Sequence, residues 1–299
     1  MSTQRPTTDY TNVVDKSSDD KRKPLFSRRF KQAFTIPRTI AGVGVIVLVA
    51  IMLTAQWIAP HDPLAQDISS RFASVGTPGH WLGADNFGRD TLSRSLYGIQ
   101  AELIVALSAT MISLVFGTII GLLAGYFRGV AEVIGMRGVD VILAFPPIII
   151  ALLAATLYGP GAVTLIVVLG VLFIPQFARI SYGQTLSISQ KEFVEASEIF
   201  GANSFVRLFR VILPNIAAPI FVQFSLTMAA AVLLESGLSF LGLGIVPPDP
   251  SLGAMVAEGQ RHMVSEPAVI LVPAILLSLI ILAFSLLGDA LRDWLDPRK

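Results

Sequence analysis

Long apolar runs alternate with short polar segments along the whole chain. A helix needs about 20 residues to cross the roughly 30 Å of hydrocarbon in a bilayer. Six runs reach that length, and the fifth, which is long and rich in glycine near its end, predicts a tilt or a broken end. The pattern predicts an all-α polytopic membrane protein with six transmembrane helices, at Thr39–Ala59, Leu103–Phe127, Val139–Tyr158, Ala162–Tyr182, Ile216–Leu241 and Ala268–Leu287.

Composition supports this class and the charges orient it. Only 14% of the 299 residues are charged and 53% are hydrophobic, whereas a soluble domain carries about 25% charged residues. With the N-terminus inside, only four of the 22 Lys and Arg residues lie in outer segments, namely Arg71, Arg89, Arg94 and Arg261. The positive-inside rule therefore predicts that both termini are cytoplasmic.

Four segments organise the chain. Residues 1–37 form a basic cytoplasmic tail without an early apolar core, so no cleavable signal peptide is expected. We interpret the tail as a solvated segment that helps to fix topology, and a lipid- or partner-binding role stays open. Residues 38–98 hold the first span and an extracytoplasmic loop, residues 99–289 hold a five-helix core, and residues 290–299 form a cytoplasmic tail.

Two outer segments are too long to be simple turns. Pro60–Tyr97 is polar and predicts a small extracytoplasmic cap with a short helix. Pro247–Pro267 predicts an amphipathic helix, which turns Glu258, Arg261 and His262 away from an apolar face made of Leu252, Met255, Val256 and Met263.

A polar interruption, Ser187–Pro214, lies on the predicted cytoplasmic side. Ser189 and Glu192 have the spacing of a capping box, and Gly201 suits a left-handed helix end. Pro214 is expected to end the segment. Between them, a second short amphipathic helix is expected to turn Arg207 and Arg210 away from an apolar face made of Phe205, Leu208, Phe209 and Ile212. Two short helices at the membrane surface would offer a binding site for a partner protein.

Polar and helix-breaking residues inside the spans are candidates for a translocation path. Glu235 would cost about 2.5–3.5 kcal/mol at a membrane centre, so it should face a cavity or a partner. It either lines the path or steadies the broken end of the fifth helix; alternatively, it lies in water at the outer interface. Pro146 and Pro175 predict kinks that border the bundle interior.

Other residues at the helices have simpler interpretations. Glu102, like Glu132, Asp140 and Asp289, is expected to lie in water near a membrane boundary. Glycines at every fourth position of the second span permit close helix contact, and they are Gly117, Gly121 and Gly125.

Several kinds of chemistry have no support in the sequence. Without a GxxxxGK[ST] loop, the chain should not hydrolyse ATP, so it is not predicted to be an enzyme. No cysteine is present, and His61, His80 and His262 lack metal-ligand spacing, so no metal or cofactor site is predicted. A self-contained secondary transporter would need ion-coupling groups in its spans, and only Glu235 is available.

One motif resembles the EAA loop of ABC importer permeases. It reads Glu195-Ala196-Ser197-x-x-x-Gly201 and continues nine residues later with Val211-x-Leu213-Pro214. Four further stretches resemble the C-type permease subunit of dipeptide/oligopeptide/nickel importers, namely His80–Gly98, Met136–Pro147, Leu233–Gly253 and Leu286–Arg298.

This resemblance implies a type I ABC importer permease fold in a bacterial cell membrane. It implies that the loop with Glu195, Ala196, Ser197, Gly201, Leu213 and Pro214 docks on a cytoplasmic ATP-binding subunit. Two such subunits would use ATP and Mg, a B-type permease would complete the pathway, and an extracytoplasmic binding protein would deliver substrate. Short peptides are the expected substrate, with glutathione-like compounds or nickel chelates as alternatives.

Overall fold

The computed structural model describes residues 36–295, without the side chains of residues 36–38 and 40. All but the last two residues of the predicted N-terminal tail, and the last four residues of the C-terminal tail, lie outside the described residues. The described part is built from helices, with bounds α2 Ile36–Ile58, α3 Thr91–Phe127, α4 Gly129–Leu143, α5 Pro147–Tyr158, α6 Ala162–Leu172, α7 Ile174–Ile188, α8 Glu192–Ile199, α9 Ser204–Val206, α10 Leu213–Phe240, α11 Leu252–Gln260 and α12 Pro267–Leu295. Two short turns, the 3₁₀-helix η1 at Ile68–Ser70 and the π-helix η2 at Arg207–Ile212, complete the list.

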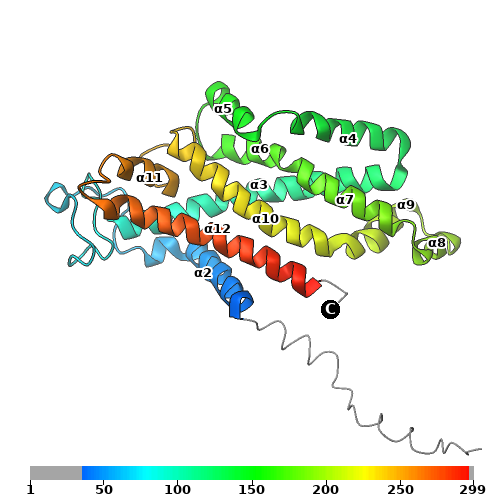
Figure 1. Ribbon diagram of the computed structural model, residues 1–299, viewed down its shortest axis with the longest axis horizontal. Coiled ribbons are helices and arrows are strands. Elements are labelled where there is room, and N and C mark those ends of the chain that lie inside the picture. The colour runs from blue at the N-terminus through cyan, green and yellow to red at the C-terminus, as the bar shows by residue number, and fades with distance from the viewer. Residues whose placement is uncertain (1–35, 296–299) are drawn as a thin grey trace, which may run out of the picture.

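Figure 1 shows the long helices running side by side along one axis. The loop 59–90 and α11 lie at one end of this bundle, and α8 lies at the other. We call these the α11 end and the α8 end. Helix α3 packs against α7, α6 and α10, while α12 packs against α10, α11 and α2.

Five of the six predicted spans are confirmed as helices that are long and apolar enough to cross a membrane, within the described residues. The second begins at Thr91, well before the predicted Leu103, because Asp90 caps the helix. The Asp90 carboxylate accepts a hydrogen bond from the backbone N–H of Ser93 at 2.8 Å, which satisfies a donor of the first turn. The predicted outer cap is therefore shorter than Pro60–Tyr97, and its short helix is the single turn η1.

The third predicted span, Val139–Tyr158, is wrong as a single helix. It is divided between α4 and α5, whose axes differ by 82°. The break coincides with Pro146 and Pro147, because a proline lacks an N–H donor and disfavours a helical residue before it. Pro147 instead begins α5, where a missing N–H costs nothing.

The glycines of α3 allow it to touch α7 backbone to backbone, which confirms the predicted close contact. A Cβ atom on Gly121 would lie 2.4 Å from the carbonyl oxygen of Ala178, and one on Gly117 would lie 2.6 Å from that of Ile174. Distances this short are possible only without a side chain, so α3 and α7 form the closely packed centre of the bundle.

Charged residues join the α11 end into one unit. Arg89 Nε lies 2.6 Å from Asp85 Oδ2, and Arg89 Nη2 lies 3.0 Å from Glu258 Oε2. Arg94, buried at the start of α3, lies 3.4 Å from Asp85 and 3.5 Å from Glu258. Glu258 was expected on the outward face of its helix. It turns inward because two buried guanidinium groups require balancing carboxylates.

Gly121→Ala tests the contact between α3 and α7. The added methyl group would strike the backbone of α7, so we expect the free energy of unfolding to fall by about 1–3 kcal/mol, as for other overpacked cores. Gly183→Ala on α7 is the matched control, because a Cβ there meets nothing within 4 Å. Thermal unfolding of the detergent-solubilised protein measures the difference, and equal midpoints for the two variants would contradict the packing described.

Candidate functional site

The predicted docking loop forms a rigid, well-terminated helix. Helix α8 ends with Gly201 at φ +83°, the left-handed conformation that was predicted. The N–H of Ala202 donates to the carbonyl of Ser197 at 3.0 Å, and the N–H of Gly201 donates to that of Glu198 at 2.9 Å. This pair of hydrogen bonds is a Schellman motif, which satisfies carbonyl groups that the helix end would otherwise leave free.

The predicted capping box at the start of α8 is wrong. Ser189 directly follows α7, and its hydroxyl donates to the carbonyl of Leu186 at 3.2 Å. Helix α8 begins after Lys191 and has no side-chain cap. Glu192 and Glu195 lie in its first turn instead, where their negative charges interact favourably with the positive end of the helix dipole and stabilise the helix.

The segment after α8 does not end at Pro214, as the sequence had suggested. Helices α9, η2 and α10 run on as one 37-residue helical stretch, Ser204–Phe240. The side chain of Asn203 caps its start by accepting from the N–H of Val206 at 2.9 Å. The π-helical turn η2 lies directly before Pro214, where the missing N–H would interrupt an ordinary α-helix.

Arg207 also differs from the prediction, because it turns inward. It forms an ion pair with Glu198 of α8, and its guanidinium lies 5.5 Å from the centre of the Tyr126 ring at the end of α3. This one side chain therefore contacts α8 and α3 from the start of the long helix. A charge in this position holds three elements together.

A buried apolar cluster lies under α8. Val194 is the buried residue of α8, and it packs with Leu208 and Ile212 of η2. Leu122 of α3 and Phe177 of α7 belong to the same cluster. Because these side chains are closely packed, a movement of α8 is expected to displace η2, α3 and α7 as well.

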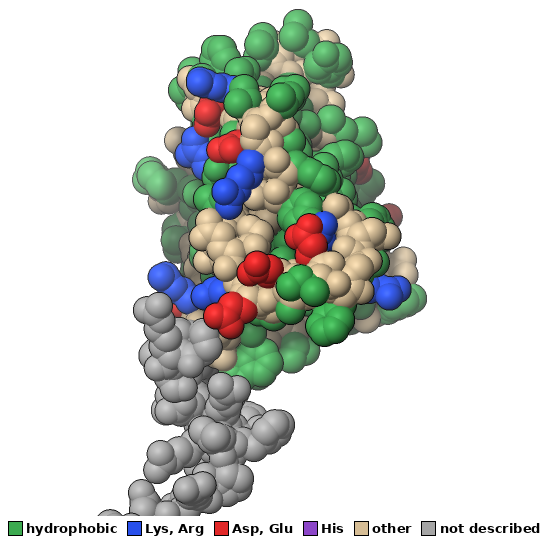
Figure 2. Space-filling view, turned by 90° about the vertical axis from the view of Figure 1, so that its right-hand side faces the viewer, with side chains coloured by type: hydrophobic (Ala, Val, Ile, Leu, Met, Phe, Trp, Pro, Cys, Tyr) green, Lys and Arg blue, Asp and Glu red, His purple; other side chains and the backbone are tan. Residues whose placement is uncertain are grey.

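The outer surface of the α8 end is unusually apolar. Phe200 is 89% exposed and Ile199 is 80% exposed, and Phe193 and Phe205 are exposed beside them. Figure 2 shows hydrophobic side chains at this end among acidic and basic ones. We call these four residues the apolar tip. A patch of this kind beside charged groups is typical of a surface that binds a protein partner.

Some residues of the EAA-like motif are exposed on the surface, and others are partly buried against the rest of the bundle. Glu195 is exposed on α8, whereas Ala196 and Ser197 are half-buried. The Ser197 hydroxyl donates to the carbonyl of Val194 at 2.6 Å. Leu213 and Pro214 begin α10. A hollow of about 510 Å³ lies beside α8 and is lined partly by Lys191, Glu195, Glu198 and Arg207.

Two glutamates meet inside the bundle, towards the α11 end. Glu102 of α3 and Glu235 of α10 are both 0% exposed, and their carboxyl groups lie within hydrogen-bonding reach of each other. Glu102 was expected in water at a membrane boundary, and that expectation is wrong. The wet-interface interpretation of Glu235 is contradicted too, because the side chain is completely buried.

Hydrogen bonds connect this carboxyl pair to the end of α10. The Ser236 hydroxyl donates to Glu102, and the Ser239 hydroxyl donates to Glu235 Oε1 at 2.6 Å. The Ser239 oxygen also accepts from the N–H of Ile245 at 3.0 Å, beyond the helix end at Phe240. Glu235 is therefore placed where it can steady this end of the helix, and it is not part of an open surface.

The two proline candidates lie on separate helices. Pro146 is exposed at the break between α4 and α5, and Pro175 is buried in the first turn of α7.

Sequence reasoning missed a polar group near the middle of two spans. The amide of Gln223 on α10 donates to Gln176 Oε1 on α7 at 2.9 Å, and Thr227 Oγ1 lies 3.2 Å from the same oxygen. Gln176 is exposed, although it lies halfway along an apolar span. Amides at that depth should face water or a partner, because lipid cannot satisfy them. Two glutamines within apolar runs were the available signal.

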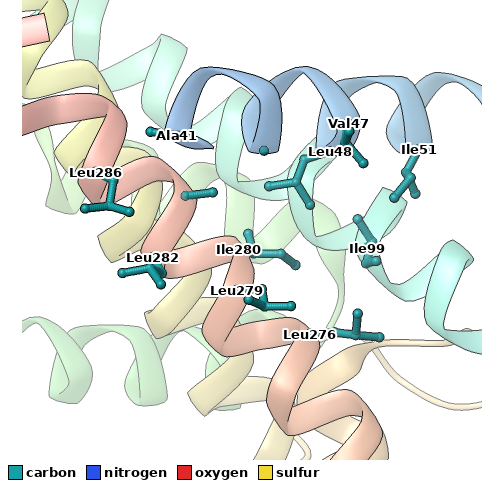
Figure 3. A pocket seen from close by; sticks show the side chains of 12 residues that line it. Ala41, Val47, Leu48, Ile51, Ile99, Leu276, Leu279, Ile280, Leu282 and Leu286 are labelled. Atoms are coloured by element: carbon teal, nitrogen blue, oxygen red, sulfur yellow. The ribbon is translucent and has the colours of Figure 1, made fainter. Parts of the chain in front are cut away.

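An apolar cavity between α2 and α12 differs from these sites. It measures about 320 Å³, and Figure 3 shows side chains such as Leu48, Ile280 and Leu286 around it. All of its lining residues are aliphatic or glycine. A cavity lined without polar side chains can accommodate a lipid chain, but its side chains offer no hydrogen-bonding group to a polar substrate.

These features are those of a polytopic helical membrane protein with an exposed apolar tip at one end and a polar patch at mid-depth. The fold has a solved counterpart. A structure of the MetNI methionine ABC transporter in an inward-facing conformation aligns with a TM-score of 0.54 and 20% identity, covering 74% of this chain and 100% of that chain. The fold is that of a type I importer permease.

Sequence comparisons identify the family. The family described as "Binding-protein-dependent transport system inner membrane component" matches residues 117–299. The glutathione transport system permease protein GsiD of Pectobacterium atrosepticum is 38% identical over 286 residues, covering 96% of this chain and 94% of that protein. GsiD of Escherichia coli O1:K1 / APEC is 38% identical over 273 residues, covering 91% and 89%. The chain belongs to this family of inner membrane components, and it functions as a permease of an ABC importer.

Glu235→Gln and Glu235→Leu test the buried carboxyl pair. Glutamine keeps an oxygen that accepts from Ser239, so its thermal unfolding should stay close to that of the wild type. Leucine removes the acceptor and leaves a buried hydroxyl without its partner, which should cost about 1–3 kcal/mol. If both variants unfold at the wild-type temperature, the hydrogen-bonded connection does not stabilise α10.

Proposed function

We propose that this permease moves short peptides, including glutathione-like tripeptides, through a pathway that it forms with a B-type permease subunit. The likeness to glutathione permeases over nearly the whole chain supports a substrate of this class. Two cytoplasmic ATP-binding subunits that use ATP and Mg drive the movement, and an extracytoplasmic binding protein delivers the substrate.

The α8 end faces the cytoplasm in this proposal. The loop 59–90 and α11 lie at the other end, and the only Lys and Arg residues of the sequence on that side are Arg71, Arg89, Arg94 and Arg261. The α8 end carries Arg128, Lys191, Arg207 and Arg210, and nine further Lys and Arg residues precede the apolar part of α2 in the sequence. The positive-inside rule assigns the end with the excess of Lys and Arg in its short loops to the cytoplasm. Both described chain ends, at Ile36 and Leu295, then lie on the cytoplasmic side.

The apolar tip is the observation that carries the coupling mechanism. A short helix with an exposed apolar face is a common way to fill a groove on a partner protein. The Schellman motif at Gly201 and the ion pair of Arg207 with Glu198 keep the tip from moving independently. Closure of the ATP-binding subunits would therefore move α8 together with the helix Ser204–Phe240.

Gln176 and Gln223 line the pathway in this proposal, and the buried Thr227 supports Gln176 from within the bundle. A peptide carries amide donors and acceptors along its backbone, and side-chain amides can exchange hydrogen bonds with it. The three residues lie on α7 and α10, which continue directly to the docking loop on both of its sides. Movement of the loop would reorient this patch.

Phe200→Ser tests docking at the apolar tip. Removing a large exposed ring from the centre of a contact typically costs 2 kcal/mol or more, so affinity for the ATP-binding subunits should fall about 30-fold. Val264→Ser is the matched control, because Val264 is 96% exposed but lies at the α11 end. Co-purification and titration of the ATP-binding subunits on nanodisc-embedded permease measure the effect.

Wild-type affinity in Phe200→Ser would overturn the docking proposal. An equal loss in Val264→Ser would show that general surface change, and not the tip, is responsible.

Gln176→Leu tests the pathway. Leucine has a similar size but cannot bond a peptide, so we expect uptake of a glutathione-like peptide to fall while assembly and nucleotide-stimulated docking persist. Uptake into proteoliposomes that contain the whole transporter measures this. Val163→Ala, at an exposed position near the start of the same span, serves as the control. Unchanged uptake in Gln176→Leu would remove Gln176 from the path.

A further inference from the structure

Two of the three outer-loop histidines come together at the α11 end. Both lie within the loop 59–90, His61 shortly after the end of α2 at Ile58 and His80 later in the loop. Their rings stack with centroids 5.4 Å apart and an interplanar angle of 27°. Asp90, the cap of α3, completes the group, since its carboxylate lies 3.0 Å from His80 Nδ1 and 3.8 Å from His61 Nδ1.

The three side chains lie close enough together to bind one metal ion. Each offers one ligand atom, and these atoms all lie within 4.8 Å of one another. A tetrahedral ion with bonds of about 2.0–2.2 Å brings its nitrogen and oxygen ligands to such mutual distances after small side-chain rotations. Two imidazoles with one carboxylate leave a fourth position for water or another ligand.

The surroundings hold these ligands in place. Asp90 is 1% exposed, and its Oδ2 accepts from the N–H of Ser93 at 2.8 Å and from the Ser93 hydroxyl at 2.7 Å. The same hydroxyl oxygen accepts from the backbone N–H of His61 at 3.1 Å. Oδ1 remains directed at His80. Hydrogen bonds that orient a metal ligand in this way are the usual support of a metal site.

The cluster is also reachable from solvent. The side chain of His61 is 45% exposed, whereas that of His80 is 14% exposed. An ion can therefore enter from the surface and meet the buried carboxylate at the base of the site.

We propose that His61, His80 and Asp90 bind one divalent transition-metal ion of the zinc class. Imidazole nitrogen with a single carboxylate suits Zn²⁺ and its neighbours, whereas Mg²⁺ and Ca²⁺ require mainly oxygen ligands. The bound ion joins the start of the loop 59–90, its middle part and its end, where Asp90 caps α3. It thereby fixes the position of the loop at the α11 end. Binding depends on these side chains and not on which side of the membrane they face.

Zn²⁺ titration of the full-length permease tests this proposal. The protein carries no polyhistidine tag, is treated with a chelator, and is then titrated calorimetrically in nanodiscs. We expect one Zn²⁺ per chain, with affinity lowered at least tenfold in His61→Ala and further in the double variant with His80→Ala. A large excess of Mg²⁺ should not displace it.

His262→Ala is the matched control, because this third histidine contacts Phe72 and does not belong to the cluster. It should bind Zn²⁺ as the wild type does. Thermal unfolding without metal checks that His61→Ala is folded, and Co²⁺ provides a second readout, since bound imidazoles give it a visible absorption spectrum. Absence of saturable binding, or binding that survives loss of both His61 and His80, overturns the proposal.

Discussion

The unbroken helix Ser204–Phe240 is the constraint on which the rest of this structure depends. Its first turns carry Arg207, Leu208 and Ile212, which bind α8, and its last turns carry Glu235 and Ser239, which bind α3 and the following turn. A continuous helical stretch of this length can transmit a displacement of one end to the other where its packing against neighbouring helices holds it, since the π-helical turn, Pro214 and Pro219 interrupt its own hydrogen bonds. A displacement at the α8 end is therefore expected to reach the far end of α10, which is what the proposed coupling to a partner subunit requires.

The bundle around this helix is rigid in some places and open in others. Backbone contact at Gly117 and Gly121 fixes α3 to α7, and the ion pairs of Arg89 and Arg94 with Glu258 fix the α11 end. In contrast, α4 and α5 keep many apolar side chains exposed around the break at Pro146. Such a surface is typical of a region that another subunit or lipid covers.

Much of the fold could be predicted because apolar length alone identifies spans. The failures have local causes. Pro146 and Pro147 divide one apolar run into two helices, and periodicity does not show whether a proline pair kinks a span or breaks it. Pro214 was expected to end a helical segment. The helix instead continues past it, because a π-helical turn precedes the proline. Glu258 turned inward towards Arg89 and Arg94, which are far away in the sequence. Arg207 turned inward towards its neighbour Glu198 and the distant Tyr126. His61, His80 and Asp90 have no motif spacing, so only folding reveals that they meet.

In the proposed mechanism, the docking loop and α10 move as one body. Since the chain contains no cysteine, single cysteines at Ala202 and Leu233 can carry spin labels without background from this subunit. Electron–electron distance measurements on the assembled transporter would then compare nucleotide-free and ATP-bound states. We expect one narrow distance between the two labels that is the same in both states, while distances from Ala202 to the partner permease change. A loop-to-α10 distance that shifts or broadens on ATP binding would contradict it.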